Sequence, residues 1–127
     1  MAYWLFLDDT RDPPRIWPQD AVVVRNSAEF AAVLRKRGCP ECISFDHDLG
    51  PGEPTGMDCA RLFIEWVLDG RERMHPDFAF RVHSMNPPGK ANIEALMGRF
   101  VKAFAAGDYG TVRQAIGSTK GGGAGSS

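Results

Sequence analysis

Polar residues follow three apolar runs of this sequence at the point where each run ends. They are Asp8 and Asp9 after the first run, Asp46, His47 and Asp48 after a later one, and His83, Ser84 and Asn86 after the last. If these runs are parallel strands of one sheet, their carboxyl ends meet at one edge, where open α/β sheets bind ligands. Carboxylates gathered there repel one another unless a cation or a shared proton compensates them. The pattern therefore predicts a functional site at this edge.

The spacing of strands, helices and breakers predicts an α/β fold. Apolar and β-branched runs predict strands at 3–7, 21–25, 42–46 and 78–84, and helical periodicity with capping residues predicts helices at 26–38, 57–69 and 90–106. Prolines at 13, 14 and 18 exclude a helix after the first strand, so that connection is expected to be an irregular loop. Strands separated by helices favour a small doubly wound, mainly parallel sheet of about four strands.

Composition limits the chain to one domain and excludes several classes of partner. The 127 residues are 43% hydrophobic, which suffices for a single core, predicted to span residues 1–116 with a flexible Gly/Ser-rich tail at 117–127. Fifteen basic and sixteen acidic residues leave no strong electrostatic footprint for nucleic acid. No membrane span or basic leader is visible, and three cysteines, an odd number, favour a reducing compartment. We expect a cytoplasmic protein.

The strand-end carboxylates are candidate metal ligands. Asp8, Asp9, Asp46 and Asp48 supply the hard oxygen atoms that Mg²⁺ or Mn²⁺ prefers. Because Mg²⁺ is usually held by one or two carboxylates together with water and substrate phosphate, Asp8 or Asp9 with Asp46 forms the expected core of the site. The alternative is that some of these residues cap loops or pair with Arg11 or Arg15.

His47 and His83 are candidate proton-transfer groups. A pair of imidazoles, one neutral and one charged, can take a proton from water and give one to a leaving alkoxide near neutral pH. Asp46 joins them as the third candidate catalytic residue. The alternative for either histidine is a structural ring that hydrogen-bonds to a backbone carbonyl.

The turn after the last strand has the features of an anion site. Ser84 and Asn86 offer donors, Gly89 allows close backbone approach, and Lys90 adds charge near the start of the next helix. The alternative is ordinary capping, with Ser84 or Asn92 as the cap. Arg11 is a candidate phosphate clamp, and an equally open alternative is that it forms a salt bridge to Asp9 or Asp12.

These strand-end residues resemble two-component receiver domains. Asp8 and Asp9 match the receiver's acidic pair, Asp46 its phosphate-accepting aspartate, and Ser84 its hydroxyl residue. Two features differ: the usual first helix is replaced by the proline-rich loop, and no fifth strand carries the receiver lysine, since Lys120 lies in the tail. Lys90 is a candidate replacement for that lysine.

The segments LDDTRDPP, SFDHDLG and VHSMNPPGKANI, with a TG dipeptide between the last two, resemble a divergent group, the cyclic-phosphate-processing receiver family, over residues 3–97. The resemblance implies a phosphodiesterase-type hydrolase acting on a cyclic nucleotide or a 2′,3′-cyclic RNA end. Two alternatives stay open: a phosphoacceptor or pseudo-receiver signalling module, and an adaptor that binds a nucleotide without turnover.

Overall fold

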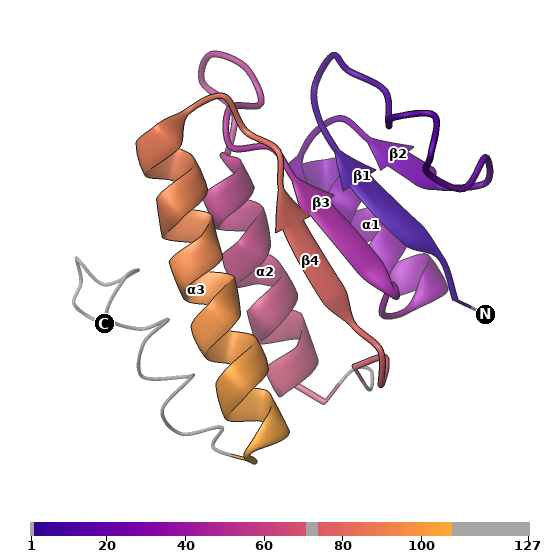
Figure 1. The fold of residues 1–127 in the computed structure, drawn as a ribbon, viewed down its shortest axis with the longest axis vertical. Coiled ribbons are helices and arrows are strands. Elements are labelled where there is room, and N and C mark those ends of the chain that lie inside the picture. The colour runs from indigo at the N-terminus through magenta and orange to yellow at the C-terminus, as the bar shows by residue number, and fades with distance from the viewer. Residues whose placement is uncertain (1, 71–73, 108–127) are drawn as a thin grey trace.

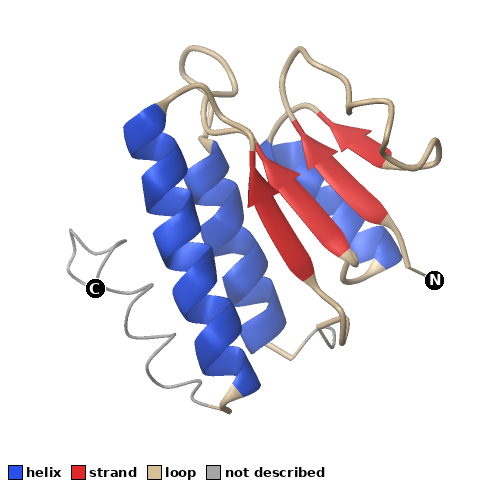
Figure 2. Ribbon diagram, viewed as in Figure 1, coloured by secondary structure: helices blue, strands red, loops and turns tan. Residues whose placement is uncertain are grey.

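The computed structural model describes residues 2–70 and 74–107, which form four strands and three helices around one sheet (Figures 1 and 2). The elements are β1 (Trp4–Leu7), β2 (Val22–Val24), α1 (Ser27–Arg37), β3 (Cys42–Phe45), α2 (Gly56–Leu68), β4 (Ala79–Val82) and α3 (Pro87–Ala105). Each strand and helix predicted within the described residues is present, while a short helix expected at 108–117 lies outside them. The predicted domain boundary at 116–117 lies outside the described residues.

The sheet is fully parallel, with the strand order β2-β1-β3-β4. The chain therefore crosses the sheet in one direction from β1 to β2, and in the other direction from β2 to β3 to β4. Right-handed crossovers place connections of opposite direction on opposite faces. The predicted doubly wound, receiver-like α/β fold is confirmed, and the switch between the two directions lies between β1 and β3.

One face of the sheet is covered by the three helices, and we call it the helix face. In Figure 1, α1 lies behind β1 and β3, while α2 and α3 lie side by side. The main hydrophobic core lies between these helices and the sheet. It includes Leu5, Leu7, Val24, Ile43, Phe45 and Val82 from the strands and Phe30, Leu34, Phe63, Ile64, Ile93, Met97 and Phe100 from the helices. All of these side chains are at least nine-tenths buried.

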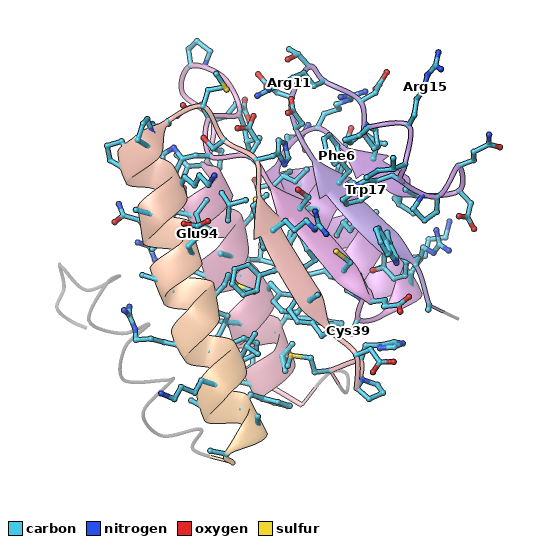
Figure 3. All side chains as sticks on the ribbon, viewed as in Figure 1. Phe6, Arg11, Arg15, Trp17, Cys39 and Glu94 are labelled. Atoms are coloured by element: carbon cyan, nitrogen blue, oxygen red, sulfur yellow. The ribbon has the colours of Figure 1, made fainter. Side chains whose placement is uncertain are left out.

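The other face, which we call the loop face, carries the residues that alternate with the core residues along the strands: Trp4, Phe6, Val23, Cys42, Ser44, Ala79 and Arg81. No helix of the described residues covers it. Instead the proline-rich connection between β1 and β2 folds back over it, and Trp17 packs edge-on against Trp4 and Phe6 at centroid distances of 5.0 and 5.3 Å (Figure 3). A loop with one buried tryptophan thus takes the place of a helix.

Capping residues define where the helices begin. Asn26, rather than the alternative Ser27, caps α1, and Thr55 forms a capping box with Asp58 at the start of α2. The third helix begins at Pro87 rather than at residue 90, because proline is well tolerated in a first helical turn. Its cap is Asn86, so the alternative in which Ser84 or Asn92 caps this helix is wrong. None of the helices in the described part of the chain is both long and apolar enough to cross a bilayer.

Candidate functional site

Three polar residues stand in one row across the carboxyl edge of the sheet. Asp8, Asp46 and His83 each follow the last residue of a strand, and each continues the backbone ladder by one hydrogen bond. The bonds run from Asp46 N–H to the carbonyl of Leu7 and from His83 N–H to the carbonyl of Phe45, both 3.0 Å. Parallel pairing therefore holds the three in register on β1, β3 and β4, on both sides of the topological switch.

The His83 side chain lies across the sheet rather than pointing away from it. Its ring stacks on Phe6 of β1, with centroids 4.5 Å apart and planes 8° from parallel. Nδ1 lies 2.7 Å from the hydroxyl of Ser44 on β3, and Nε2 lies 3.0 Å from Oδ2 of Asp8. The ring therefore starts on β4, passes over β3 and ends at β1, which leaves 23% of the side chain exposed.

Asp8 is the most heavily hydrogen-bonded residue of the row and is fully buried. Its Oδ1 accepts from the backbone N–H groups of Thr10 and Arg11 at 3.0 and 2.8 Å. Its Oδ2 contacts Nε of Arg11 at 3.2 Å and Nε2 of His83. Burial alone would raise the pKa of Asp8, but the two backbone hydrogen bonds and the one from His83 outweigh burial and lower it. Asp8 is thus held as a carboxylate.

Asp46 has the opposite environment. It is only 5% exposed, one of its oxygens accepts from the backbone N–H of His47 at 2.9 Å, and no group in the described residues bonds the other oxygen. Burial, and then the negative charge of Asp8, raise the pKa of Asp46. The start of α2 packs closely beneath it: a Cβ on Gly56 would lie 1.8 Å from the Asp46 carbonyl oxygen. Only glycine fits there.

The row forms a cluster that has the donor atoms of a metal site. One ligand atom each from Asp8, Asp46 and His83 lies within 4.8 Å of the others. Of the four predicted carboxylate ligands, the structure brings together two. Asp9 is half-buried next to the Gly50 turn, and Asp48 is exposed; neither belongs to a ligand cluster in the described part of the chain.

His47 lies beside the cluster with its ring directed elsewhere. Nδ1 lies 2.9 Å from Asp48, and the ring packs on the first turn of α3, where a Cβ on Gly89 would approach it to 2.4 Å. Gly89 therefore makes room for an imidazole rather than for a ligand. The catalytic role predicted for His47 stays a prediction.

The predicted anion site after β4 is occupied by the chain's own hydrogen bonds. The side-chain oxygen Oδ1 of Asn86 accepts from Gly89 N–H, and its side-chain Nδ2 donates to Oδ2 of Asp48 at 3.3 Å. Ser84 is buried, and its hydroxyl accepts from the Asn86 N–H. Since Pro87 and Pro88 have no N–H, the start of α3 offers few donors to an anion. Phosphate binding by Ser84 and Asn86 stays a prediction.

Two cations remain as candidate phosphate ligands. Arg11 pairs with Asp8 rather than with Asp9 or Asp12, and 51% of its side chain is exposed. In Figure 3 it lies on the loop above the carboxyl ends of the strands, whereas Arg15 points away into solvent. Only Nε of Arg11 is engaged by the described residues, so its terminal nitrogens can bind a phosphate. Lys90 is exposed on α3, and no ion pair joins it to the described cluster.

Sequence analysis missed two residues that shape the site, Ser44 and Arg25. Ser44 lies within β3, and its apolar neighbours dominate the strand pattern. The signal that could have found it is alternation along the strand, because Ser44 points to the face opposite to that of Ile43 and Phe45. Arg25 follows β2 and donates to the carbonyls of Asp8 and Arg11, at 3.1 and 2.6 Å. It thereby fixes the loop that carries Arg11.

Comparison with known proteins identifies the family. The family model of the cyclic-phosphate processing receiver domain matches residues 3–99, which is more than half of the chain and nearly the stretch expected from the motifs. Searches of curated proteins and of solved structures gave no match. The matched residues contain all four strands, α1, α2, most of α3 and the whole Asp8–Asp46–His83 row. The chain belongs to the family of cyclic-phosphate processing receiver domains.

Proposed function

We propose that this chain hydrolyses a cyclic phosphodiester at the carboxyl edge of its sheet, over Asp8, Asp46 and His83. The observation that carries the proposal is the closeness of the three groups, whose ligand atoms lie within 4.8 Å of one another. This space suits one phosphoryl group or one cation with its ligands. The substrate class, a cyclic nucleotide or a 2′,3′-cyclic RNA end, rests on the family.

Asp8 and Asp46 fit a divalent cation of the Mg²⁺ or Mn²⁺ type. Both are carboxylates, and the second oxygen of Asp46 has no donor among the described groups. The raised pKa of Asp46 results partly from the nearby Asp8 charge, and a cation between them would relieve that repulsion. Such an ion, when bound, offsets the negative charge that develops on the phosphoryl oxygens.

Opening a cyclic diester with water needs one group that takes a proton from the water and another that protonates the leaving alkoxide. Asp46 and His83 are the neighbouring pair that can exchange protons in this way. Burial raises the pKa of Asp46, which makes its carboxylate a better proton acceptor than an exposed aspartate when no cation contacts it. Arg11 lies at the rim, where its terminal nitrogens can hold the phosphoryl oxygens.

The test is turnover of 2′,3′-cyclic AMP, and of a short RNA with a 2′,3′-cyclic end, in Mg²⁺, Mn²⁺ or EDTA, followed by ³¹P NMR. Asp46→Asn and His83→Gln should abolish most of the activity. Matched controls are Asp20→Asn, an exposed carboxylate on the β1–β2 loop, and His75→Gln, which precedes β4 at the opposite edge of the sheet. The controls should retain full activity. Equal losses in the control variants would contradict the assignment.

The same assay separates the alternatives. Incubation with acetyl phosphate and Mg²⁺ should leave Asp46 unmodified; a stable phosphoaspartate without diesterase activity would favour the phosphoacceptor module. Retained nucleotide binding without turnover of any cyclic phosphate would favour the adaptor.

A further inference from the structure

Ser44 is a buried hydroxyl residue beneath the imidazole of His83. It is 3% exposed, lies in the middle of β3 on the loop face, and its Oγ is 2.7 Å from Nδ1 of His83. Among the described residues, that nitrogen is the one hydrogen-bond partner of the Ser44 side chain. A larger side chain at this position would meet the ring that crosses above it.

The hydrogen bonds around His83 decide which nitrogen carries the proton of the neutral ring. A buried hydroxyl hydrogen needs an acceptor, and for Ser44 that acceptor is Nδ1. The ring proton then sits on Nε2, from which it donates to Oδ2 of Asp8 at 3.0 Å. The other tautomer is disfavoured at both ends in the resting site: the Ser44 hydroxyl would have no acceptor, and a lone pair of Nε2 would face a carboxylate oxygen.

We infer that Ser44, acting with Asp8, fixes the neutral ring of His83 as a donor through Nε2, so that this ring is neither the base of the reaction nor a metal ligand and serves as its acid only in the doubly protonated form. Ser44 is then a positioning residue. The inference about acid catalysis rests on the proposed hydrolysis, whereas the tautomer does not.

The serine hydroxyl suits this role because it can accept as well as donate. When the ring carries two protons, Nδ1–H donates to Oγ of Ser44 and the ring need not move. From this doubly protonated ring, with no cation on Asp46, water attacks phosphorus and loses its proton to Asp46. The P–O bond to the leaving oxygen breaks, and that oxygen takes the Nε2 proton, which leaves a neutral ring whose Nδ1–H is held by Ser44. The proton on Asp46 then returns to Nε2, so that the net change is addition of one water to the diester.

The test is ¹⁵N NMR of histidine-labelled, metal-free protein, at a pH where the His83 ring carries one proton. We expect a protonated Nε2 and an unprotonated Nδ1 whose shift shows that it accepts a hydrogen bond. In Ser44→Ala, Nδ1 should move to the shift of a nitrogen without a donor; in Ser44→Cys, which keeps a weak donor, it should move only partway. Cys42→Ala, on the same face of the same strand, should leave both signals unchanged.

Two further measurements complete the test. Addition of Mg²⁺ alone should leave the proton on Nε2, and kcat in Ser44→Ala should fall about tenfold with little change in KM, which corresponds to one hydrogen bond. A wild-type ring protonated at Nδ1, or a proton that moves to Nδ1 when Mg²⁺ is added, would overturn the inference. Either outcome leaves the proposed hydrolysis intact, with His83 as base or ligand, while a failed search for turnover leaves the tautomer result unaffected.

Discussion

The two faces of the sheet use alternate residues of the same strands for different purposes. On the helix face, Leu5 and Ile43 enter a continuous apolar core under three helices. On the loop face, the adjacent residues Phe6 and Ser44 support the ring of His83. The comparison teaches that residues of the core and residues of the candidate site can alternate at a spacing of one residue, because successive side chains of a strand point to opposite sides. Mutations should therefore fall into two classes.

The largest effect on stability should come from the helix face. Phe63 of α2 is fully buried and contacts Phe78 and Phe100, so Phe63→Ala should lower the free energy of unfolding by about 3–5 kcal/mol. Urea denaturation measures this loss. Turnover per folded molecule should stay close to wild type, since the residue lies away from the row. Reduced turnover at unchanged stability would break the division between the faces.

The largest effect on rate should come from the loop face. His83→Gln should lower kcat by roughly 10²–10⁴-fold, the range of a positioned proton-transfer group, and should leave the molecule folded by circular dichroism. His47→Ala provides the comparison. An equal loss in that variant would support the two-histidine mechanism, whereas full turnover would make His47 a structural residue packed on Gly89.

Neutralising Asp8 and neutralising Asp46 should change the stability of the fold in opposite directions. Asp8→Asn exchanges an acceptor of four contacts for an amide, and should lower the free energy of unfolding by about 1.5–3 kcal/mol, as for hydrogen bonds to charged groups. Asp46→Asn removes a buried charge repelled by Asp8 and should raise the melting temperature in EDTA. Thermal unfolding of both variants checks the pair; a stabilised Asp8→Asn would contradict the hydrogen-bond account.

The smallest expected effect is a change with pH in the stability that Asp46→Asn gains over the wild-type protein. Because the folded-state pKa of Asp46 is raised, its protonated form stabilises the fold, fully below the ordinary value of 3.8, and this contribution is lost as pH rises through the folded pKa. The free energy of unfolding of Asp46→Asn should therefore exceed that of the wild type most near neutral pH, and the two should converge below a pH of about 3.8. Asp8 behaves oppositely. Because its pKa in the folded protein is lowered, its carboxylate stabilises the fold at pH values above the ordinary pKa, and this contribution is lost as the solution is acidified.

The sequence predicted the fold and the row because both depend on local patterns. Apolar runs and caps located every strand and helix of the described residues, and the rule that parallel strands end at one edge placed Asp8, Asp46 and His83 together. Ser44 was not predicted as a site residue, because its importance arises only from strand register, which pairs it with Phe6. Asn86 was assigned to phosphate, although its position before two prolines suits a cap equally well. Local residue type does not distinguish these uses.

The hydrogen bond between His83 and Asp8 joins residues 75 positions apart in the chain. During synthesis, at about 5–20 residues per second, the first strand of the site is made several seconds before the last. No truncated chain that lacks β4 can hold Asp8 in its final environment, so activity should appear abruptly with chain length instead of in increments. A ribosome-bound fragment ending before residue 79 would carry both acidic residues of the row and yet lack the His83 ring on which the proposed hydrolysis depends.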